Sequence, residues 1–386
     1  MHSNKPKILF IVRDNANSAY TWSGIPNHII KIFKEYHHNF ITLDQLGFPK
    51  NFVWRLKNKL SKFSKHFAPK YYSPSTAQYY GKMISKKIKN LEYDLIFAID
   101  FIEGISEIQT EKPIFVFKDA SYIQLNEINY PGFEKFTPSD IVHLHESEKL
   151  GAKRSNLILL TSEWAIDNFK RIHPETNANK FIKVPFSGQV YPPPLPNKSR
   201  SVDRNKVIKF LFVGRAWERK GGPKVLKILN ILNEMGLTVS LDIVGSVPFK
   251  ENPYDFDINL HGDLDKNNEE QNSKLNSLYD DSHFFIFPTF NDCSPIVTIE
   301  SLSYGLPVIT HHVGGTPEII KNGECGICLP PATSERIFAE EIEEIINSPS
   351  QYSKIVKNSI SKFESEFHPK TFVDNVIKTY ESFVSK

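Results

Sequence analysis

The sequence has few cysteines and no long apolar run, and each shortage excludes a class of protein. Three cysteines in 386 residues are too few for a disulfide-stapled secreted domain and are typical of a reducing compartment. The run from Ile8 to Val12 is far too short for a signal-peptide core or a membrane span, and no other run approaches the ~20 residues that a span needs. We therefore expect a cytoplasmic protein, with peripheral contact to the inner face of a membrane as the alternative.

The charge balance and the cysteine spacing exclude further classes. Lys and Arg number 47 against 44 Asp and Glu, and a net charge of +3 indicates no polyanionic partner such as nucleic acid. Cys325 and Cys328 form a C-x-x-C pair, but no second pair and no matching histidine accompanies them. We interpret them as small apolar residues in a packed loop, not as a zinc or redox site.

Short apolar runs alternate with longer amphipathic stretches along the chain. The expected strands lie at 7–12, 94–99, 113–117, 157–161 and 181–186, and again at 209–214, 239–245, 283–289 and 306–310. Helix-length stretches such as 222–235 and 334–347 lie between them. Apolar residues follow one another within the runs, as in parallel strands covered on both faces. The pattern predicts an α/β protein with two doubly wound, Rossmann-like sheets.

A proline-rich polar stretch separates the two series of strands. Four prolines fall at 192–194 and 196, and a polar run without periodicity follows them. This is a linker composition. We expect an N-terminal domain over 1–190, a linker over 191–204 and a C-terminal domain over 205–368.

The segment 51–91 is basic throughout. It contains ten Lys and Arg residues, no acidic residue, and an apolar stripe at helical spacing formed by Phe52, Leu56, Leu60, Phe63 and Phe67. A helix docked on its domain with a solvated basic face explains this pattern, and so does a patch that rests on anionic lipid. Nearby tyrosines could stack on bases, but no nucleic-acid-binding motif accompanies them, so we expect no nucleic acid.

Two cations follow the first strand of the second series. That strand ends at Gly214, Arg215 and Lys220 lie in the loop, and a helix is expected after Gly221. Cations beside a strand-to-helix turn make a site for a diphosphate.

A second anion-binding feature is expected where a helix follows the run at 283–289. Ser294 is predicted as its N-cap and Pro295 as its first residue, with the helix ending at Tyr304 before Gly305. The free N–H groups near Ile296 and Val297 would then point to the carboxyl edge of the sheet, where they favour negative charge.

Glu300 lies inside this otherwise apolar helix. A carboxylate is costly to bury unless it is paired or has a task. Acidic residues bind ribose hydroxyls in dinucleotide folds, which is one reading of Glu300, and pairing with a buried cation is the other. A further close-approach loop, Gly314-Gly315, follows the next strand and precedes Thr316, Pro317 and Glu318.

Together these motifs resemble the retaining glycosyltransferases of family four, whose GT-B fold has two Rossmann-like domains facing each other across a cleft. The family carries an acidic residue, seven others and then Glu, and Asp292 and Glu300 hold those places. Its G-R-x4-K motif is matched at 214–220, and its G-G-x-P-E motif at 314–318. Asp at 292, where many members have Glu, is a departure. The family's last helix crosses back to the first domain, which implies the same for 369–386.

The resemblance implies roles for individual residues. Arg215 and Lys220 are expected to bind the diphosphate of a nucleotide-sugar donor, and Glu300 its ribose. Asp292 is expected to face the donor sugar, and it forms the expected catalytic set together with Arg215, Lys220 and Asp119. The other residues that we expect to bind the donor are Gly24, Gly214, Ser246, Leu264, Cys293, Ser294, Pro295, Ile296 and Val297.

The N-terminal half resembles the family in shorter segments. Ser23-Gly24 would place backbone amides near the diphosphate, and His28 follows in the next helix. Many members have histidines after the second strand of this half, where this chain has Asp100 instead. Asp100 and Asp119 are therefore expected as acceptor-side polar groups together with Ser23 and His28, and ordinary loop aspartates are the alternative.

The implied activity is the transfer of a sugar, with retention at the anomeric carbon, from a UDP- or GDP-sugar. The expected acceptor is a hydroxyl of a saccharide or lipid-linked molecule in cell-surface polysaccharide or glycolipid synthesis. No cofactor or metal is expected, because the cations and the helix start already supply positive potential and the D-x-D triplets at 255–257 and 263–265 are no more frequent than chance predicts. A nucleotide-sugar epimerase and a non-catalytic binding subunit remain alternatives.

Overall fold

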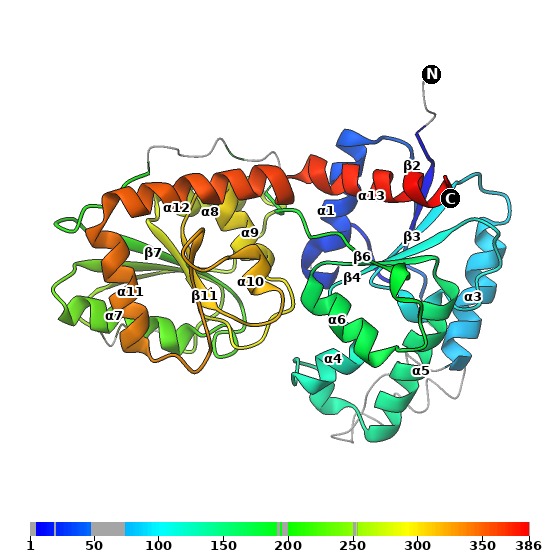
Figure 1. Cartoon of the computed structure of the whole chain (residues 1–386), viewed down its shortest axis with the longest axis horizontal. Coiled ribbons are helices and arrows are strands. Elements are labelled where there is room, and N and C mark those ends of the chain that lie inside the picture. Colours follow the sequence, from blue (N-terminus) through cyan, green and yellow to red (C-terminus); the bar gives the residue numbers. More distant parts are fainter. Residues whose placement is uncertain are drawn as a thin grey trace. The chain divides into compact units, whose positions relative to one another are not determined.

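The computed structural model describes residues 5–18, 21–47, 74–190, 194, 200–249, 252 and 254–385. The chain divides into two units, one formed by Met1–Pro185 with Val373–Lys386 and the other by Phe186–Phe372. In the described ranges, each unit contains one six-stranded parallel sheet with helices packed on it (Figure 1). The α/β fold class with two Rossmann-like sheets is confirmed, whereas the cleft expected between the two domains stays a prediction.

The first sheet has the strand order β2-β1-β3-β4-β5-β6. Its strands are β1 (Ile8–Ile11), β2 (Phe40–Leu43), β3 (Leu95–Ile99), β4 (Ile114–Lys118), β5 (Leu157–Leu160) and β6 (Phe181–Lys183). The helices of this unit are η1 (Thr21–Gly24), α1 (Ile25–Tyr36), α3 (Pro74–Ile88), η2 (Ile102–Gly104), α4 (Tyr122–Glu127), η3 (Phe133–Lys135), α5 (Pro138–Arg154), α6 (Glu163–Ile172) and η4 (Ala178–Lys180). The chain adds β2 on one side of β1 and then adds β3 on the other side. The order in which strands are added therefore reverses between β1 and β3.

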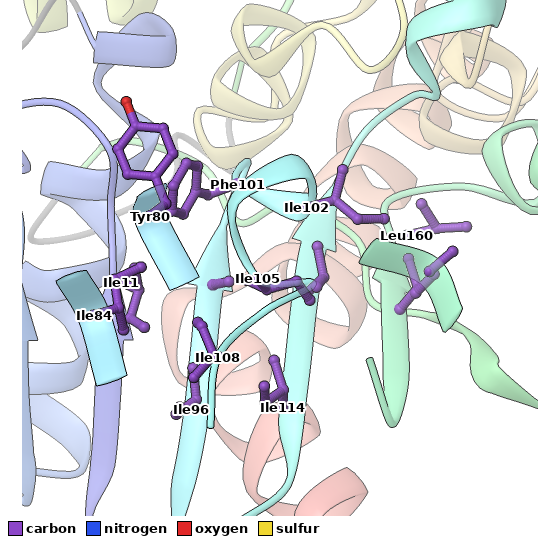
Figure 2. Close-up of a cluster of buried hydrophobic side chains, with 14 of the residues drawn as sticks. Ile11, Tyr80, Ile84, Ile96, Phe101, Ile102, Ile105, Ile108, Ile114 and Leu160 are labelled. Atoms are coloured by element: carbon purple, nitrogen blue, oxygen red, sulfur yellow. The ribbon is translucent and has the colours of Figure 1, made fainter. Parts of the chain in front are cut away.

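Both faces of the first sheet are covered, which explains why its strands are apolar at successive positions. On one face, Ile96 of β3 and Ile114 of β4 pack with Tyr80 and Ile84 of α3 (Figure 2). On the other face, Phe10 of β1 meets Phe33 of α1 edge to face, with 5.0 Å between ring centroids.

The second sheet has the order β12-β11-β10-β7-β8-β9. Its strands are β7 (Ile208–Val213), β8 (Val239–Val244), β9 (Asp257–Gly262), β10 (Phe284–Phe287), β11 (Val308–His311) and β12 (Gly326–Leu329). The helices are α7 (Gly222–Glu234), α8 (Glu269–Asp281), α9 (Ile296–Ser303), α10 (Thr316–Ile319), α11 (Glu335–Asn347), α12 (Pro349–Lys362) and η5 (Phe363–Phe367). Helix α7 packs with α11 and α9 packs with α12, on opposite sides of the sheet (Figure 1). In this sheet, the order in which strands are added reverses between β7 and β10.

The last helix, α13 (Pro369–Val384), begins in the second unit and ends in the first. Its Phe383 meets Phe115 of β4 with 5.6 Å between ring centroids, and Tyr380 lies 6.5 Å from the same ring. The first unit is therefore built from two pieces of chain that are far apart in sequence.

Several sequence predictions fall on residues outside the described ranges. The apolar stripe from Phe52 to Phe67 lies outside them, and so does most of the predicted linker 191–204. The described remainder of the basic segment forms α3, whose last turn carries Lys86 and Lys87. Of the helices in the described residues, none combines the length and the apolar character needed to cross a bilayer.

Candidate functional site

The strand order of the second sheet reverses between β7 and β10, a topology that in doubly wound sheets places a crevice at the carboxyl ends of these two strands. Loops that leave neighbouring strands in opposite directions diverge, and ligands of doubly wound sheets bind where this happens. The loop after β7 carries Lys220, and the loop after β10 carries Asp292. Their side chains meet there, because Lys220 Nζ donates a hydrogen bond to Asp292 Oδ2.

This ion pair is nearly buried. The exposed fractions of the Lys220 and Asp292 side chains are 15% and 10%. Thr289 Oγ1 donates to Asp292 Oδ2 at 3.2 Å, and Arg219 Nη1 lies 3.8 Å from the same oxygen. Burial lowers the pKa of Lys220, and the Asp292 carboxylate opposes that shift. The crevice thus holds two cations against one carboxylate, a balance that favours an added anion.

The loop that holds Lys220 can adopt its path only with glycine at position 221. Gly221 has a φ of +81° and is the N-cap of α7, and a Cβ atom there would lie 2.1 Å from the Pro288 carbonyl oxygen. The loop after β7 is thereby pressed against the end of β10. Arg215, by contrast, projects outward, and its Nε donates to Asp263 Oδ1 at 3.3 Å with both side chains more than half exposed.

The helix after β10 begins one residue later than predicted. Its N-cap is Pro295 and no side chain caps it, so the prediction of Ser294 as N-cap and Pro295 as first helical residue is wrong. A proline N-cap has no hydroxyl or carboxylate to accept from the first turn. The early N–H groups of α9, near Ile296 and Val297, therefore lack a side-chain cap and can receive a ligand's oxygen.

Glu300 lies on α9 and is completely buried. Lys266 Nζ donates to Glu300 Oε1, and the Tyr279 hydroxyl donates to Oε2 at 3.2 Å. Burial, reinforced by the Glu300 carboxylate, raises the pKa of Tyr279 well above its ordinary value. Lys266 comes from the loop between β9 and α8 and is one-third exposed, so the pair opens to solvent on the lysine side.

The loop after β11 closes against the Asp292 loop. Gly314 has a φ of +55°, and a Cβ atom there would lie 2.0 Å from the Asp292 carbonyl oxygen. The Gly315 N–H donates to the Cys293 carbonyl. Because Cys293 and Ser294 are also buried, this loop fixes the backbone at the start of α9.

The remaining predicted donor residues are more open. Gly214 directly follows β7, and its N–H donates to the Val244 carbonyl at 2.9 Å. Ser246 follows β8 and is exposed, and Leu264 follows β9 and is partly buried. Three loops at one edge of the sheet thus carry these residues.

The residues predicted in the first unit lie at the carboxyl edge of its own sheet. Ser23 is exposed with a φ of +55°, Gly24 is the N-cap of α1, and His28 is buried in that helix. Asp100 directly follows β3 and accepts from Lys118 Nζ at 3.0 Å. Asp119 directly follows β4.

Four functional candidates have no signal in the sequence motifs. Arg219 and Thr289 hold Asp292, and Lys266 and Tyr279 hold Glu300. The spacing of Tyr279 from Leu275 predicts a buried helical position, but nothing in the sequence names its partner. Lys266 stands in a polar loop where a lysine is unremarkable.

A family model described as Glycosyl transferases group 1 matches residues 196–362. The capsular polysaccharide biosynthesis glycosyltransferase CapM of Staphylococcus aureus is 28% identical over 177 residues, which are 45% of this chain and 46% of CapM. Spore coat protein SA of Bacillus subtilis is 27% identical over 180 residues, 44% of this chain and 48% of that protein. The chain thus spans about half the length of the curated relatives it matches.

Solved structures resemble the whole chain. A glycosyltransferase from Rickettsia africae has a TM-score of 0.67 at 13% identity, covering 99% of this chain and all of that one. Anabaena HepE in complex with UDP has a TM-score of 0.64 at 14% identity, with coverages of 97% and 100%. At such identities the likeness shows the fold. The chain therefore carries a domain of the glycosyl transferases group 1 family at residues 196–362, within a fold of the GT-B type.

Proposed function

We propose that the protein is a retaining glycosyltransferase that moves a sugar from a nucleotide diphosphate sugar to a hydroxyl acceptor. One observation carries this proposal: a nearly buried lysine, Lys220, lies in the β7–β10 crevice of a domain whose helix α9 starts without a cap and carries the buried Glu300. The buried lysine and the uncapped helix start suit a diphosphate, and the carboxylate of Glu300 suits a ribose. The complexes of HepE with UDP and with UDP-glucose support a nucleotide sugar as the donor.

The donor diphosphate is held by Lys220, Arg215 and the first N–H groups of α9. Lys220 pairs with Asp292, and the donor phosphate competes with this carboxylate for the ammonium. Glu300 binds the ribose, and Lys266 must move or share the carboxylate when it does. Ser246 and Leu264 lie toward the base, and Asp292 with Cys293 and Ser294 toward the sugar.

Catalysis rests on the charge that develops when the sugar leaves the diphosphate. Preorganised cations and helix N–H groups stabilise such charge without reorganisation. Attack on the same face, assisted by the departing phosphate, needs positioning and no protein nucleophile, which accounts for retention. Asp119 belongs to the acceptor side. Lys220, Arg215 and the start of α9 supply the positive potential, so no metal or other cofactor takes part.

Calorimetric titration of UDP- and GDP-sugars into the full chain, with EDTA present, tests the donor site. We expect binding to one of the two nucleotides and at least ten-fold weaker binding in Lys220→Met. Lys227→Met, which removes a lysine 64% exposed on α7, is the matched control and should bind normally. Loss of binding in EDTA would contradict metal independence, and equal affinity in both variants would contradict the site.

The reaction class is tested with the donor that binds. Proton NMR of the products should show a new glycoside with the anomeric configuration of the donor. Formation of an epimer from donor alone would establish the epimerase alternative. Donor binding without turnover on any acceptor would support a non-catalytic subunit. CapM's name supports the choice of saccharide or lipid-linked acceptors of surface-polysaccharide synthesis.

The site of action that we propose is the cytoplasmic face of a membrane. At the amino edge of the first sheet, a groove of about 1090 Å³ is lined by Lys5, Lys7, Lys86, Lys89 and Lys112, beside two acidic residues, and Leu91 on its rim is 37% exposed. Lysines around an exposed apolar side chain suit anionic lipid. Lys86→Glu/Lys89→Glu should abolish co-sedimentation with phosphatidylglycerol vesicles. Lys227→Glu should co-sediment like the unmodified chain. Co-sedimentation of the double variant would contradict the proposed membrane contact.

A further inference from the structure

A second pocket lies in the first unit, at the point where its sheet changes direction. It has a volume of about 370 Å³ and opens between the carboxyl ends of β1 and β3. Arg13 and Asp14 line it from the loop after β1, Asp100 from the residue after β3, and Trp22 from the turn before α1. This is the position at which doubly wound sheets bind ligands, and the volume lies in the range of small-molecule sites. We call it the β1–β3 pocket.

Two lining residues hold strained backbone conformations. Trp22 has a φ of +41° and Asp100 a φ of +46°, in the left-handed region that residues other than glycine rarely adopt. Such conformations cost free energy and persist where the surrounding structure enforces them, most often at ligand sites. The strain places an indole and a carboxylate at one opening, with the indole edge against Phe117 at 6.0 Å between ring centroids.

Behind Asp100 lies a lysine that is almost completely buried. Lys118 is 1% exposed, and its Nζ donates to Asp100 Oδ1 at 3.0 Å and lies 4.0 Å from a Glu148 oxygen. The ammonium also lies 3.8 Å from the centroid of the Tyr122 ring. Burial alone would lower the pKa of Lys118, but the carboxylates of Asp100 and Glu148 outweigh burial and raise it. Lys118 therefore stays charged and fixes one oxygen of Asp100.

The other Asp100 oxygen, Oδ2, has no hydrogen-bond or ion-pair partner within the described part of the chain, and the side chain is 31% exposed. Arg13, the cation that lines the pocket, is already engaged by Asp14 and by the buried Glu103, each at 3.1 Å. At the pocket wall and in the buried layer behind it, two cations thus pair with four carboxyl groups. Among the described residues at the pocket, an anionic ligand would find no unengaged cation, whereas a hydroxyl can donate to Asp100.

We propose that the β1–β3 pocket binds an uncharged, hydroxyl-bearing sugar ring, with Asp100 accepting a hydrogen bond from a ring hydroxyl, Trp22 covering one ring face and Lys118 acting as the positioning residue of Asp100. The assignment of this ring to the acceptor rests on the transferase function proposed above. The acceptor then presents a neutral sugar at this position, not a phosphate or a uronate.

Saturation-transfer difference NMR on the full chain tests this proposal. The neutral probes are the methyl pyranosides of glucose, galactose, mannose and N-acetylglucosamine, and the charged probe is methyl glucuronide. We expect transfer to at least one neutral probe and at least ten-fold less to the glucuronide. Absence of transfer to all four neutral probes, or equal transfer to the glucuronide, overturns the proposal.

Variants locate the binding. Asp100→Asn is the decisive one, because asparagine tolerates the left-handed backbone and keeps the side-chain shape, while the charge is lost and one accepting oxygen becomes a donating NH2 group. It should weaken ring binding about ten-fold, as should Trp22→Ala. Asp94→Asn is the matched control: it removes a carboxylate at the amino end of the same strand, where Oδ2 accepts from the Lys7 N–H at 2.7 Å. Equal ring binding by Asp100→Asn and Asp94→Asn overturns the proposal.

A double-mutant cycle separates positioning from mere structural support. If Lys118 acts through Asp100, Lys118→Met weakens ring binding, and adding it to Asp100→Asn causes no further loss. If Lys118 only supports the fold, Lys118→Met lowers the melting temperature and leaves the ring affinity unchanged. UDP titrated into the same samples keeps the two proposals apart. UDP binding without ring binding overturns only the pocket, and ring binding without UDP binding overturns only the transferase.

Discussion

At the scale of single residues, Glu300 decides how the second unit is interpreted. Its carboxylate is fully buried and divided between Lys266 and Tyr279. Glu300→Gln should weaken UDP binding about ten-fold in calorimetry, because a hydrogen bond to a charged group contributes about 1.5–3 kcal/mol. The substitution keeps the shape of the side chain and removes its charge.

Lys266→Met supplies the control for Glu300→Gln. It removes the same ion pair but leaves the carboxylate that we expect to receive the ribose. If only Glu300→Gln loses affinity for UDP, the carboxylate itself binds the nucleotide. If both variants lower the melting temperature and bind UDP like the unmodified chain, Glu300 is a structural partner of Lys266.

His311 predicts an acid-dependent loss of stability. Its ring is buried, Nδ1 donates to the Thr289 carbonyl at 3.1 Å, and Nε2 has no partner within the described residues. Burial, followed by the charge of Lys224, lowers the pKa of His311 from 6.5 to about 4. Between pH 6.5 and pH 4, His311 is therefore protonated in the unfolded chain but neutral in the folded chain. The contribution of the neutral ring to the free energy of unfolding is complete above pH 6.5 and is lost as the pH falls toward 4.

Urea unfolding of the second unit at a series of pH values measures this effect. The free energy of unfolding should fall by up to about 3 kcal/mol from this group between pH 6.5 and pH 4. His311→Asn, which cannot titrate, should flatten the slope by about 1.4 kcal/mol per pH unit in the middle of that range. An unchanged slope would mean that His311 titrates alike in both states.

Sequence reasoning found the residues that stand out locally and missed those that matter through contact. Glu300 could be singled out because a carboxylate is anomalous in an apolar helix. Lys266 could not, because its significance depends on the path of a loop between β9 and α8. The prediction of Ser294 as N-cap is wrong because N-cap preference competes with tertiary contacts. The Asp292 loop packs against Gly314, and the helix begins after Pro295.

At the scale of elements, the loop after β11 makes a test of close packing. Gly314→Ala must bear a left-handed backbone and a Cβ atom 2.0 Å from the Asp292 carbonyl oxygen. Gly323→Ala is the control, because it has a left-handed backbone, with a φ of +77°, but no atom within 4 Å of its Cβ position. The control should lose about 1–2 kcal/mol of stability. Gly314→Ala should lose more and should also weaken UDP binding, as read from thermal shift and calorimetry, and equal losses would contradict the packing.

The strands that the sequence did not reveal share one property. β2, β9 and β12 went unpredicted, and all three lie at an edge of their sheet. An edge strand is covered on fewer sides, and two of the three are open: every residue of β2 is half-buried, and four of the six residues of β9 are exposed, whereas β12 is buried at three of its four positions. Central strands such as β3 and β10, buried throughout, could be located because burial on both faces leaves only apolar choices.

At the scale of the whole molecule, α13 ties the end of the described chain to the first sheet. Tyr380→Ser/Phe383→Ser removes the two rings that lie against Phe115. Since both are partly buried, we expect a loss of about 2–4 kcal/mol from the first unit. Val384→Ser, at a neighbouring position that is 55% exposed, should change little. Because the contact lies within the first unit, UDP binding by the second should persist, and its loss would show that the units depend on each other.

The rhythm of strands and helices was sufficient to predict the α/β class, because a parallel sheet covered on both faces imposes its own pattern. The alternation of strands and helices does not predict the strand order within each sheet. It therefore does not predict the crevice between β7 and β10, where Lys220 meets Asp292. Those depend on which strands neighbour each other. The expected cleft and the role of the predicted linker remain predictions.

The two-piece construction of the first unit also bears on how the chain is made. A ribosome synthesises 1–185 first, then the whole second unit, and only afterwards the residues from Val373 onward that join the first. Until then the nascent sheet holds Phe115 without the Phe383 ring that covers it. The first unit is thus begun before the second and finished after it, and a chaperone that shields this face during synthesis has a defined interval in which to act.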